Sequence, residues 1–178
     1  MQISRRLALT VGAGALTAAG ALGVALPATT AAAVTAAPAV SVRSTVEVRT
    51  LSDDAVMRAA QAALAAATKD GQKVSVVVMD RSGVVRIALH SAGAGPQTDE
   101  SAERKAFTAV SFGQATSALA ARAGGDGPSI RDIPGTLFLG GGVPVVVDGA
   151  PIAGIGVGGA PSGDLDEKYA AAGAAALR

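Results

Sequence analysis

The stretch that decides the fold reads VPVVVDGAPIAGIGV, residues 143–157. Two apolar runs rich in β-branched side chains flank Asp148-Gly149, a dipeptide that favours the two-residue turn of a β-hairpin because both turn positions need a positive φ. The stretch therefore predicts two antiparallel strands, residues 143–148 and 150–157.

A second hairpin is predicted upstream, where the turn chemistry of residues 80–83 separates the β-branched runs 73–79 and 84–89. A further short strand is expected at 136–139. Helices are expected at 53–69, over 99–121 with a break near 111–113, and at 164–177. This order predicts a single α+β domain in which helices flank a mostly antiparallel five-stranded sheet.

The first helix carries a clear start signal. Ser52 is placed as its N-cap, acidic residues follow in the first turn, and Leu51 and Val56 have the spacing of a hydrophobic staple. We therefore expect this helix to begin directly after Ser52.

The composition limits the classes of function. Of the 178 residues, 49% are hydrophobic, which is enough apolar surface to build a core and excludes disorder throughout. Aromatic residues make up only 2%, and 15 basic residues nearly balance 14 acidic ones, so we expect no nucleic-acid partner. The chain has no cysteine and a single histidine, His90. Any metal must therefore be held mainly by carboxylates or arrive inside a cofactor.

Residues 1–33 are typical of a cleaved signal peptide, because the basic pair Arg5-Arg6 precedes an apolar run that ends in small residues. The paired arginines also resemble a twin-arginine export signal. Cleavage before Val34 leaves residues 34–50 as a flexible arm ahead of the domain, 51–178. The sequence thus predicts secretion; the alternative is an uncleaved membrane anchor, since about 20 apolar residues suffice to span a bilayer.

Residues 154–159 read GIGVGG, which matches a dinucleotide-binding G-x-G-x-x-G by letter. The context differs from such a site, because these glycines lie in and just after a hairpin strand and the next helix is expected only at residue 164. We interpret them as a strand that packs closely against another backbone. Since the chain also lacks a Walker loop and a serine elbow, neither nucleotide binding nor hydrolase chemistry is supported.

Two pairs of acidic residues are spaced one helical turn apart. Glu100 and Glu103 form one pair, and Asp164 and Glu167 form the other. Such a pair can share a hard cation through its oxygens. The structural alternative is that Asp164 caps the last helix with Glu167 at its third position, while Glu100 interacts with the helix dipole. The sequence alone favours the structural roles.

Two further features are candidates for contact with a ligand. His90 ends the second strand of the first hairpin, where a histidine serves either as a hydrogen-bonded surface residue or as a ligand. The segments 134–136 and 140–142 bracket the expected strand at 136–139 with bare, glycine-rich backbone. Such backbone admits a flat ligand or a second subunit, and generic turns explain it equally well.

From about residue 51 to its end, the chain resembles the GlcG/HbpS family. The resemblance rests on VVMDRSG at 77–83, ERKAFTA at 103–109, PGT at 134–136 with GGGVP at 140–144, and DG at 148–149 leading to GIGVGG at 154–159. It implies the α+β fold of that family, with a profilin-like topology. The export signal and the acidic pairs resemble those of the secreted haem-binding branch.

The resemblance implies a protein that binds haem b and iron and assembles as a homo-oligomer, an octamer in this branch. It also implies an accessory role beside a membrane sensor histidine kinase in a two-component redox-sensing system. Thr136 matches the threonine that is thought to approach the haem iron, and His90 is the rival ligand because imidazole binds haem iron more strongly than a hydroxyl does. The residues matched to iron binding are Glu100, Glu103, Asp164 and Glu167.

We therefore expect a secreted, non-enzymatic haem- and iron-binding protein. One alternative is a small-molecule or corrinoid-binding module of the same fold that serves an enzyme pathway. Another is a peroxidase-like enzyme that uses bound haem, against which the lack of a second histidine and of an acid–base pair argues. A haemin titration followed by a peroxide assay separates the three.

Overall fold

The structure, a computed structural model, describes residues 37–124 and 127–178. Residues Val46–Arg178 form one compact unit. Taken by itself, the stretch 37–45 is exposed and contains one short 3-10 turn, η1 (Val42–Ser44). The predicted signal peptide, residues 1–33, lies outside the described residues. Within the described ranges, no helix has the length and apolar character needed to cross a bilayer.

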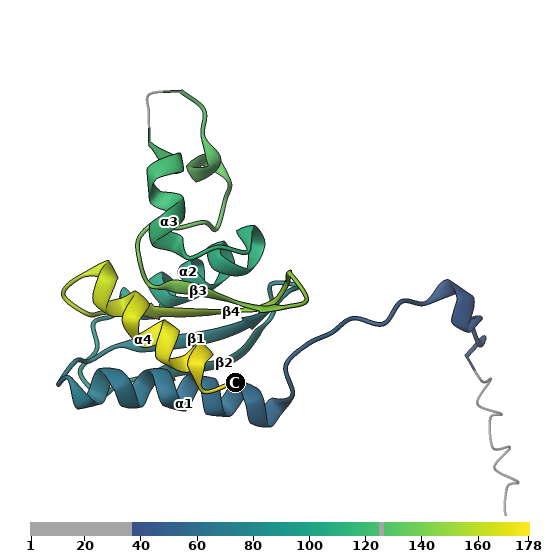
Figure 1. Ribbon diagram of the computed structural model, residues 1–178, viewed down its shortest axis with the longest axis horizontal. Helices are drawn as coiled ribbons and strands as arrows, with labels where there is room; N and C mark the ends of the chain where they lie inside the picture. The colour runs from purple at the N-terminus through teal and green to yellow at the C-terminus, as the bar shows by residue number, and fades with distance from the viewer. Residues whose placement is uncertain (1–36, 125–126) are drawn as a thin grey trace, which may run out of the picture. The chain divides into compact units, whose positions relative to one another are not determined.

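Both predicted hairpins are present. β1 (Ser75–Asp80) pairs antiparallel with β2 (Val85–His90), and β3 (Gly142–Val147) pairs antiparallel with β4 (Ala150–Gly158). The second turn has the positive φ angles that its dipeptide predicts, 51° at Asp148 and 77° at Gly149. Because β1 also pairs with β4, the sheet has the order β2-β1-β4-β3 (Figure 1).

In the part of the chain that the structure describes, the sheet has four strands, so the prediction of five is wrong. Residues 136–139, expected to form the additional strand, run as irregular chain toward β3. Side chains bind their backbone: Arg104 donates to the carbonyl oxygen of Thr136, and Leu137 N donates to Thr108 Oγ1. The apolar run 137–139 has the composition of a strand, but contacts from a distant helix take up backbone groups that a strand ladder would use.

Helices cover both faces of the sheet. α1 (Asp53–Lys69) and α4 (Gly163–Ala175) pack on one face, and α2 (Thr98–Phe112) packs on the other (Figure 1). The predicted helix over 99–121 is divided as expected, because Gly113 ends α2 with a φ of 63°. The short elements that follow α2 are α3 (Thr116–Ala120), η2 (Ala121–Ala123) and η3 (Ile130–Asp132).

The core is built on β1, which is buried on both faces. Val76 and Val78 face the core shared with α1 and α4, whereas Val77 and Met79 face α2. The predicted start of α1 is confirmed, since Ser52 Oγ accepts a hydrogen bond from the backbone of the first turn. One apolar layer thus lies on each side of the sheet.

The glycines of β4 lie where α2 passes closest to the sheet. A Cβ atom on Gly156 would lie 1.9 Å from the carbonyl oxygen of Ala102, and one on Gly154 would lie 2.3 Å from that of Ala106. No side chain fits at either position without moving the helix. This confirms that the GIGVGG motif serves close packing of strand and helix.

Candidate functional site

Thr136 ends the turn that follows η3. The residue is 4% exposed, and its Oγ1 donates a hydrogen bond of 2.7 Å to the carbonyl oxygen of Ile133. Gly135, with a φ of 81°, lets the chain turn between them. The hydroxyl hydrogen is therefore used within the turn, and only oxygen lone pairs remain for a ligand.

A cavity of about 500 Å³ opens beside Thr136. Most of the described residues that line it are apolar, and two arginines are the charged residues among them. Its lining residues are Arg104, Ala120, Ala123, Gly124, Arg131, Thr136, Leu137, Phe138 and Leu139. An apolar wall with two arginines suits a flat apolar ligand that carries carboxylates.

Arg104 of α2 connects Thr136 to the first acidic pair. Its Nη2 donates to the carbonyl oxygen of Thr136 at 2.8 Å, and its Nη1 lies 3.5 Å from Glu100 Oε1. Arg104 and Glu103 also line a smaller cavity of about 150 Å³ together with Gly135. The structure therefore brings Thr136 and this pair to one region. Arg104 is a residue that the sequence did not single out, although its i to i+4 spacing from Glu100 is a usable signal.

The first acidic pair lies open to solvent on α2. The Glu100 side chain is 77% exposed, and Glu103 is exposed as well. Among the residues that the structure describes, no group of three or more acidic, histidine or cysteine side chains could hold a metal ion. A cation at Glu100 and Glu103 would therefore need water or another molecule to complete its ligand shell.

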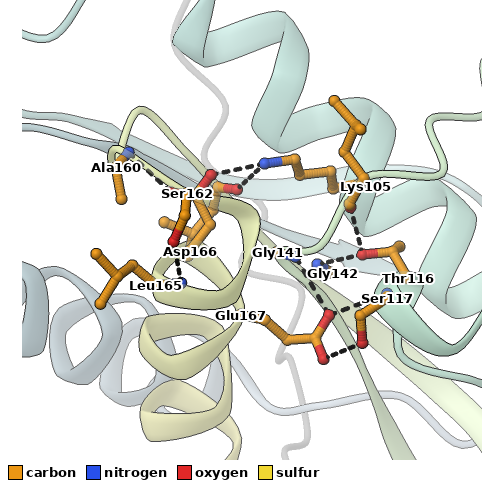
Figure 2. A network of polar contacts seen from close by, with 12 residues as sticks. Lys105, Thr116, Ser117, Gly141, Gly142, Ala160, Ser162, Leu165, Asp166 and Glu167 are labelled. Carbon is orange, nitrogen blue, oxygen red and sulfur yellow. Dashed lines mark hydrogen bonds and ion pairs between the residues drawn. The ribbon is translucent and has the colours of Figure 1, made fainter. Parts of the chain in front are cut away.

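The second acidic pair is divided by the fold. Asp164 is exposed in the first turn of α4, whereas Glu167 faces α3 (Figure 2). Glu167 Oε1 accepts from Ser117 Oγ at 2.6 Å, and Glu167 Oε2 accepts from Ser117 N at 3.1 Å and Gly141 N at 3.3 Å. A cation bound by Asp164 and Glu167 would have to compete with these hydrogen bonds.

The last helix is capped by Ser162, so the expectation that Asp164 is its N-cap is wrong. Ser162 Oγ accepts a hydrogen bond from Leu165 N, and α4 begins at the next residue, Gly163. The chain offers Ser162 and Asp164 two residues apart, and both residue types are good caps. Asp164 instead contributes negative charge to the first turn.

His90 forms a polar cluster with Ser75 and Asp99. Its Nδ1 lies 3.0 Å from both Ser75 Oγ and Asp99 Oδ1. Hydrogen bonds from Ser75 and then from His90 lower the pKa of Asp99. An ionised carboxylate can only accept, so Nδ1 of His90 carries the hydrogen and the Nε2 lone pair is left for a ligand when the ring is neutral.

The cluster is not a catalytic triad, because Ser75 and Asp99 meet the same ring nitrogen of His90. His90 does not line the cavity beside Thr136. The structure therefore places the two predicted haem ligands at separate positions.

A buried ion pair that was not predicted from the sequence joins α2, β4 and α4 (Figure 2). Lys105 Nζ donates to Asp166 Oδ2 at 2.7 Å and to the carbonyl oxygen of Val157 at 3.0 Å. Both charged residues are 3% exposed. Burial raises the pKa of Asp166, and the hydrogen bond from Lys105 opposes that effect. The partners are 61 residues apart in the chain, so no spacing rule could have paired them.

The glycine bend 140–142 faces other parts of the protein. A Cβ atom on Gly140 would lie 2.8 Å from the backbone of Gly163, and one on Gly142 would lie 2.3 Å from the carbonyl oxygen of Lys105. Gly142 therefore packs against α2, whereas Gly140 packs against Gly163 on one side and also lines a cavity of about 460 Å³ at the start of α4. The expectation that this bend offers bare backbone to a ligand stays a prediction for Gly140. A second cavity opens at Thr136 and the residues that follow it.

Comparison with known proteins relates this architecture to a described family. A family model described as "Haem degrading protein HbpS-like" matches residues 51–175. A crystal structure of HbpS is 56% identical, with a TM-score of 0.76, and the match covers 79% of this chain and 99% of that chain. Comparison with curated proteins returned no match.

Two further solved structures are similar. A Streptomyces reticuli HbpS double mutant, in which two glutamates are replaced by aspartate, is 56% identical with a TM-score of 0.77, and the match covers 80% of this chain and 98% of that chain. A structure described as a PduOC:Heme complex is 25% identical with a TM-score of 0.67, and the match covers 73% of this chain and 96% of that chain.

Proposed function

We propose, since this chain belongs to the HbpS-like family, that it binds haem b in the cavity beside Thr136. The observation that carries the proposal is the cavity of about 500 Å³, whose described lining residues are mostly apolar and include two arginines. Arg104 would pair with a haem carboxylate, and Thr136 would offer a weak oxygen ligand. Bound haem would supply a redox-active iron. A heme complex among the similar structures supports this choice of ligand.

His90 is the rival ligand, and its chemistry is favourable. Asp99 fixes the ring through Nδ1, an arrangement that orients many metal-binding histidines. Its position outside the Thr136 cavity argues against it as the ligand of the same haem. We therefore assign the haem site to the Thr136 cavity.

A haemin titration followed by visible absorption tests this assignment. Replacing Thr136 by Ala should weaken haemin binding and shift the Soret band, because it removes an oxygen ligand and leaves the cavity. Replacing His90 by Ala should leave both unchanged. The opposite pattern would move the site to His90, and two unchanged variants would contradict both assignments.

We propose further that Glu100 and Glu103 bind iron, with Asp164 and Glu167 as a second, weaker pair. In the solved double mutant of HbpS, the two replaced glutamates are three positions apart, which is the spacing of Glu100 and Glu103. Exposed carboxylates without competing thiolates favour hard iron ions. The hydrogen bonds of Glu167 make its pair the weaker candidate.

Haem degradation is the second candidate function, because the matching family model carries that description. We propose binding without turnover, since no acidic or histidine side chain is among the described residues that line the Thr136 cavity. The test adds peroxide or a reductant with oxygen to the haemin-loaded protein. A Soret band that decays no faster than in the Thr136→Ala variant supports a binding protein. Faster decay that depends on Thr136 supports an enzyme.

The biological role that we propose is secretion followed by haem and redox sensing, as an accessory to a membrane sensor histidine kinase. The support is the export pattern around Arg5-Arg6 and the family membership. Replacing both arginines by lysine should abolish export if the twin-arginine route is used.

We also propose that the protein forms a homo-oligomer, an octamer, which light scattering tests. Titration with cobalamin tests the alternative of a corrinoid-binding module.

A further inference from the structure

The segment that precedes α1 has the residue pattern of a β-strand but is not part of the sheet. Residues 40–48 read VSVRSTVEV, with valine at most even positions and polar residues at the odd positions. This alternation gives a strand one apolar face. The valines of that face are between 66% and 87% exposed: Val40, Val42, Val46 and Val48. An apolar strand face left in water favours pairing with another molecule.

The part of this segment nearest the domain is already extended. Thr45 has a φ of −119° and a ψ of 155°, and residues 45–48 belong to no helix or strand in the described chain. Thr45 caps η1, because its N–H donates to the carbonyl oxygen of Val42 at 3.1 Å. Residues 46–48 can therefore join a sheet without unwinding η1.

Of the two sheet edges, the β3 edge is protected. Pro144 in this strand has no N–H to donate, and Gly142 N already donates to Thr116 Oγ1 of α3 at 2.9 Å. Proline and covering elements are the usual protection of an exposed edge. An added strand would find few free donors there.

The β2 edge is open. Ser91 N donates to the carbonyl oxygen of Val74, and bonded and non-bonded pairs alternate along an antiparallel ladder, so the backbone groups of Ala88 and His90 face away from β1. No strand of the described chain pairs with that side. β2 contains no proline, and Ala88 is exposed. This edge can accept a strand.

We propose that residues 46–48 of one copy pair with β2 of a second copy, antiparallel and with Glu47 opposite Ala88. In this register Val46 and Val48 lie beside Leu89 and Ile87, the two β2 side chains that pack against the main core. Glu47 then lies on the polar side of the added strand. The sheet of each copy gains a fifth strand from its neighbour.

The partner is a second copy, because residues 45–48 do not pair with the outward-facing backbone groups of β2 in their own chain. Thr50 lies at the start of β2, where its Oγ1 accepts from Arg86 Nη1 at 3.1 Å. Even so, residues 45–48 form no strand with the β2 of their own chain. The inference rests on the self-association included in the proposed function, and it names the surface that mediates it.

Cysteine cross-linking tests the proposal, since the natural chain has no cysteine. Chains with Glu47→Cys and chains with Ala88→Cys are mixed under conditions that allow exchange and are then oxidised. We expect a covalent dimer. The matched control is Val48→Cys mixed with Ala88→Cys, which should cross-link poorly because residue 48 points to the opposite face. Adding Val46→Asp to the Glu47→Cys chain should lower the dimer yield about fivefold or more, whereas Thr45→Asp should not.

Two outcomes would overturn the inference directly. One is equal cross-linking through positions 47 and 48, which would indicate random collisions of the arm. The other is a Glu47→Cys/Ala88→Cys double variant that closes within one chain while the mixed single variants stay monomeric. Light scattering of the unaltered protein separates this inference from the proposed function. An oligomer without the cross-link contradicts the strand pairing alone, and a monomer contradicts the proposed self-association as well.

Discussion

Arg104 donates a hydrogen bond of 2.8 Å from Nη2 to the backbone carbonyl oxygen of Thr136. The same guanidinium lies 3.5 Å from Glu100. The side chain of Arg104 therefore contacts both the proposed haem ligand, Thr136, and a member of the proposed iron-binding pair. Because Arg104 also lines the cavity, it fixes the turn at Thr136 and supplies positive charge to a ligand. We therefore treat Arg104 as the residue that positions the site.

Replacing Arg104 by Gln should weaken haemin binding about tenfold, because a charge-assisted hydrogen bond contributes roughly 1.5–3 kcal/mol and part of it is recovered by water. Replacing it by Lys should have a smaller effect, since the charge remains but the planar fork is lost. Haemin titration measures both, with thermal unfolding as the folding control. A folded Arg104→Gln protein with unchanged haemin affinity would remove Arg104 from the site.

The two acidic pairs should respond differently to amide substitution. Glu100→Gln with Glu103→Gln should abolish iron binding and change the free energy of unfolding by no more than about 0.5 kcal/mol, because both side chains are exposed. Glu167→Gln should cost about 1 kcal/mol of stability, because it weakens the contacts with Ser117. Iron titration and urea unfolding separate the effects, with exposed Asp54→Asn as control. Undiminished iron binding by the Glu100/Glu103 variant would leave α4 as the remaining candidate.

The buried ion pair predicts a large stability effect. Lys105→Met should destabilise the protein by about 3–5 kcal/mol, because it leaves the Asp166 carboxylate buried without its partner. Adding Asp166→Leu should restore a large part of that loss, because no unpaired charge then remains. Urea unfolding of the two variants provides the comparison. A single variant as stable as the natural protein would contradict a stabilising role of the Lys105–Asp166 pair.

The contact between α1 and α4 predicts a dependence on pH. Asp70 Oδ2 accepts from Lys168 Nζ at 2.7 Å and from the Tyr169 hydroxyl at 3.0 Å, and these hydrogen bonds, Lys168 first, hold the pKa of Asp70 below its usual 3.8. A lowered carboxyl pKa stabilises the fold above pH 3.8, and this contribution is lost as the pH falls through the lower value of the folded state. Asp70→Asn should therefore lower the urea midpoint at pH 7, and the difference should narrow below about pH 3.8. A constant difference across that range would exclude this linkage.

Local signals predicted the parts of the fold that depend on neighbouring residues. Asp148-Gly149 identified its hairpin because few other dipeptides adopt two positive φ angles, and Ser52 identified the start of α1 because its hydroxyl caps the next turn. The failures lie where distant groups decide. Residues 136–139 have the composition of a strand, but Arg104 and Thr108 form hydrogen bonds with their backbone. Lys105 contacts Asp166 only in the folded chain.

The residues of the candidate site also fall into two groups, those that the sequence identified and those whose role depends on distant contacts. Thr136 was identified through a family resemblance, and the sequence also showed the spacing of Glu100 and Glu103. The role of Arg104 depends on contacts across 32 residues, and the bonds of Glu167 to Ser117 span 50 residues. Neither follows from helical periodicity.

The central claim is that haem binds in the cavity beside Thr136, and one pair of variants tests it most directly. Ala120 lines this cavity, whereas Ala118 does not, and both are exposed alanines of α3. Ala120→Trp should fill the cavity and weaken haemin binding about tenfold or more, which corresponds to about 1.4 kcal/mol. Ala118→Trp should bind haemin like the natural protein, and its tryptophan, the first in a chain that has none, reports binding by fluorescence quenching. Equal haemin affinity of the two folded variants would contradict the claim and place the haem elsewhere on the protein.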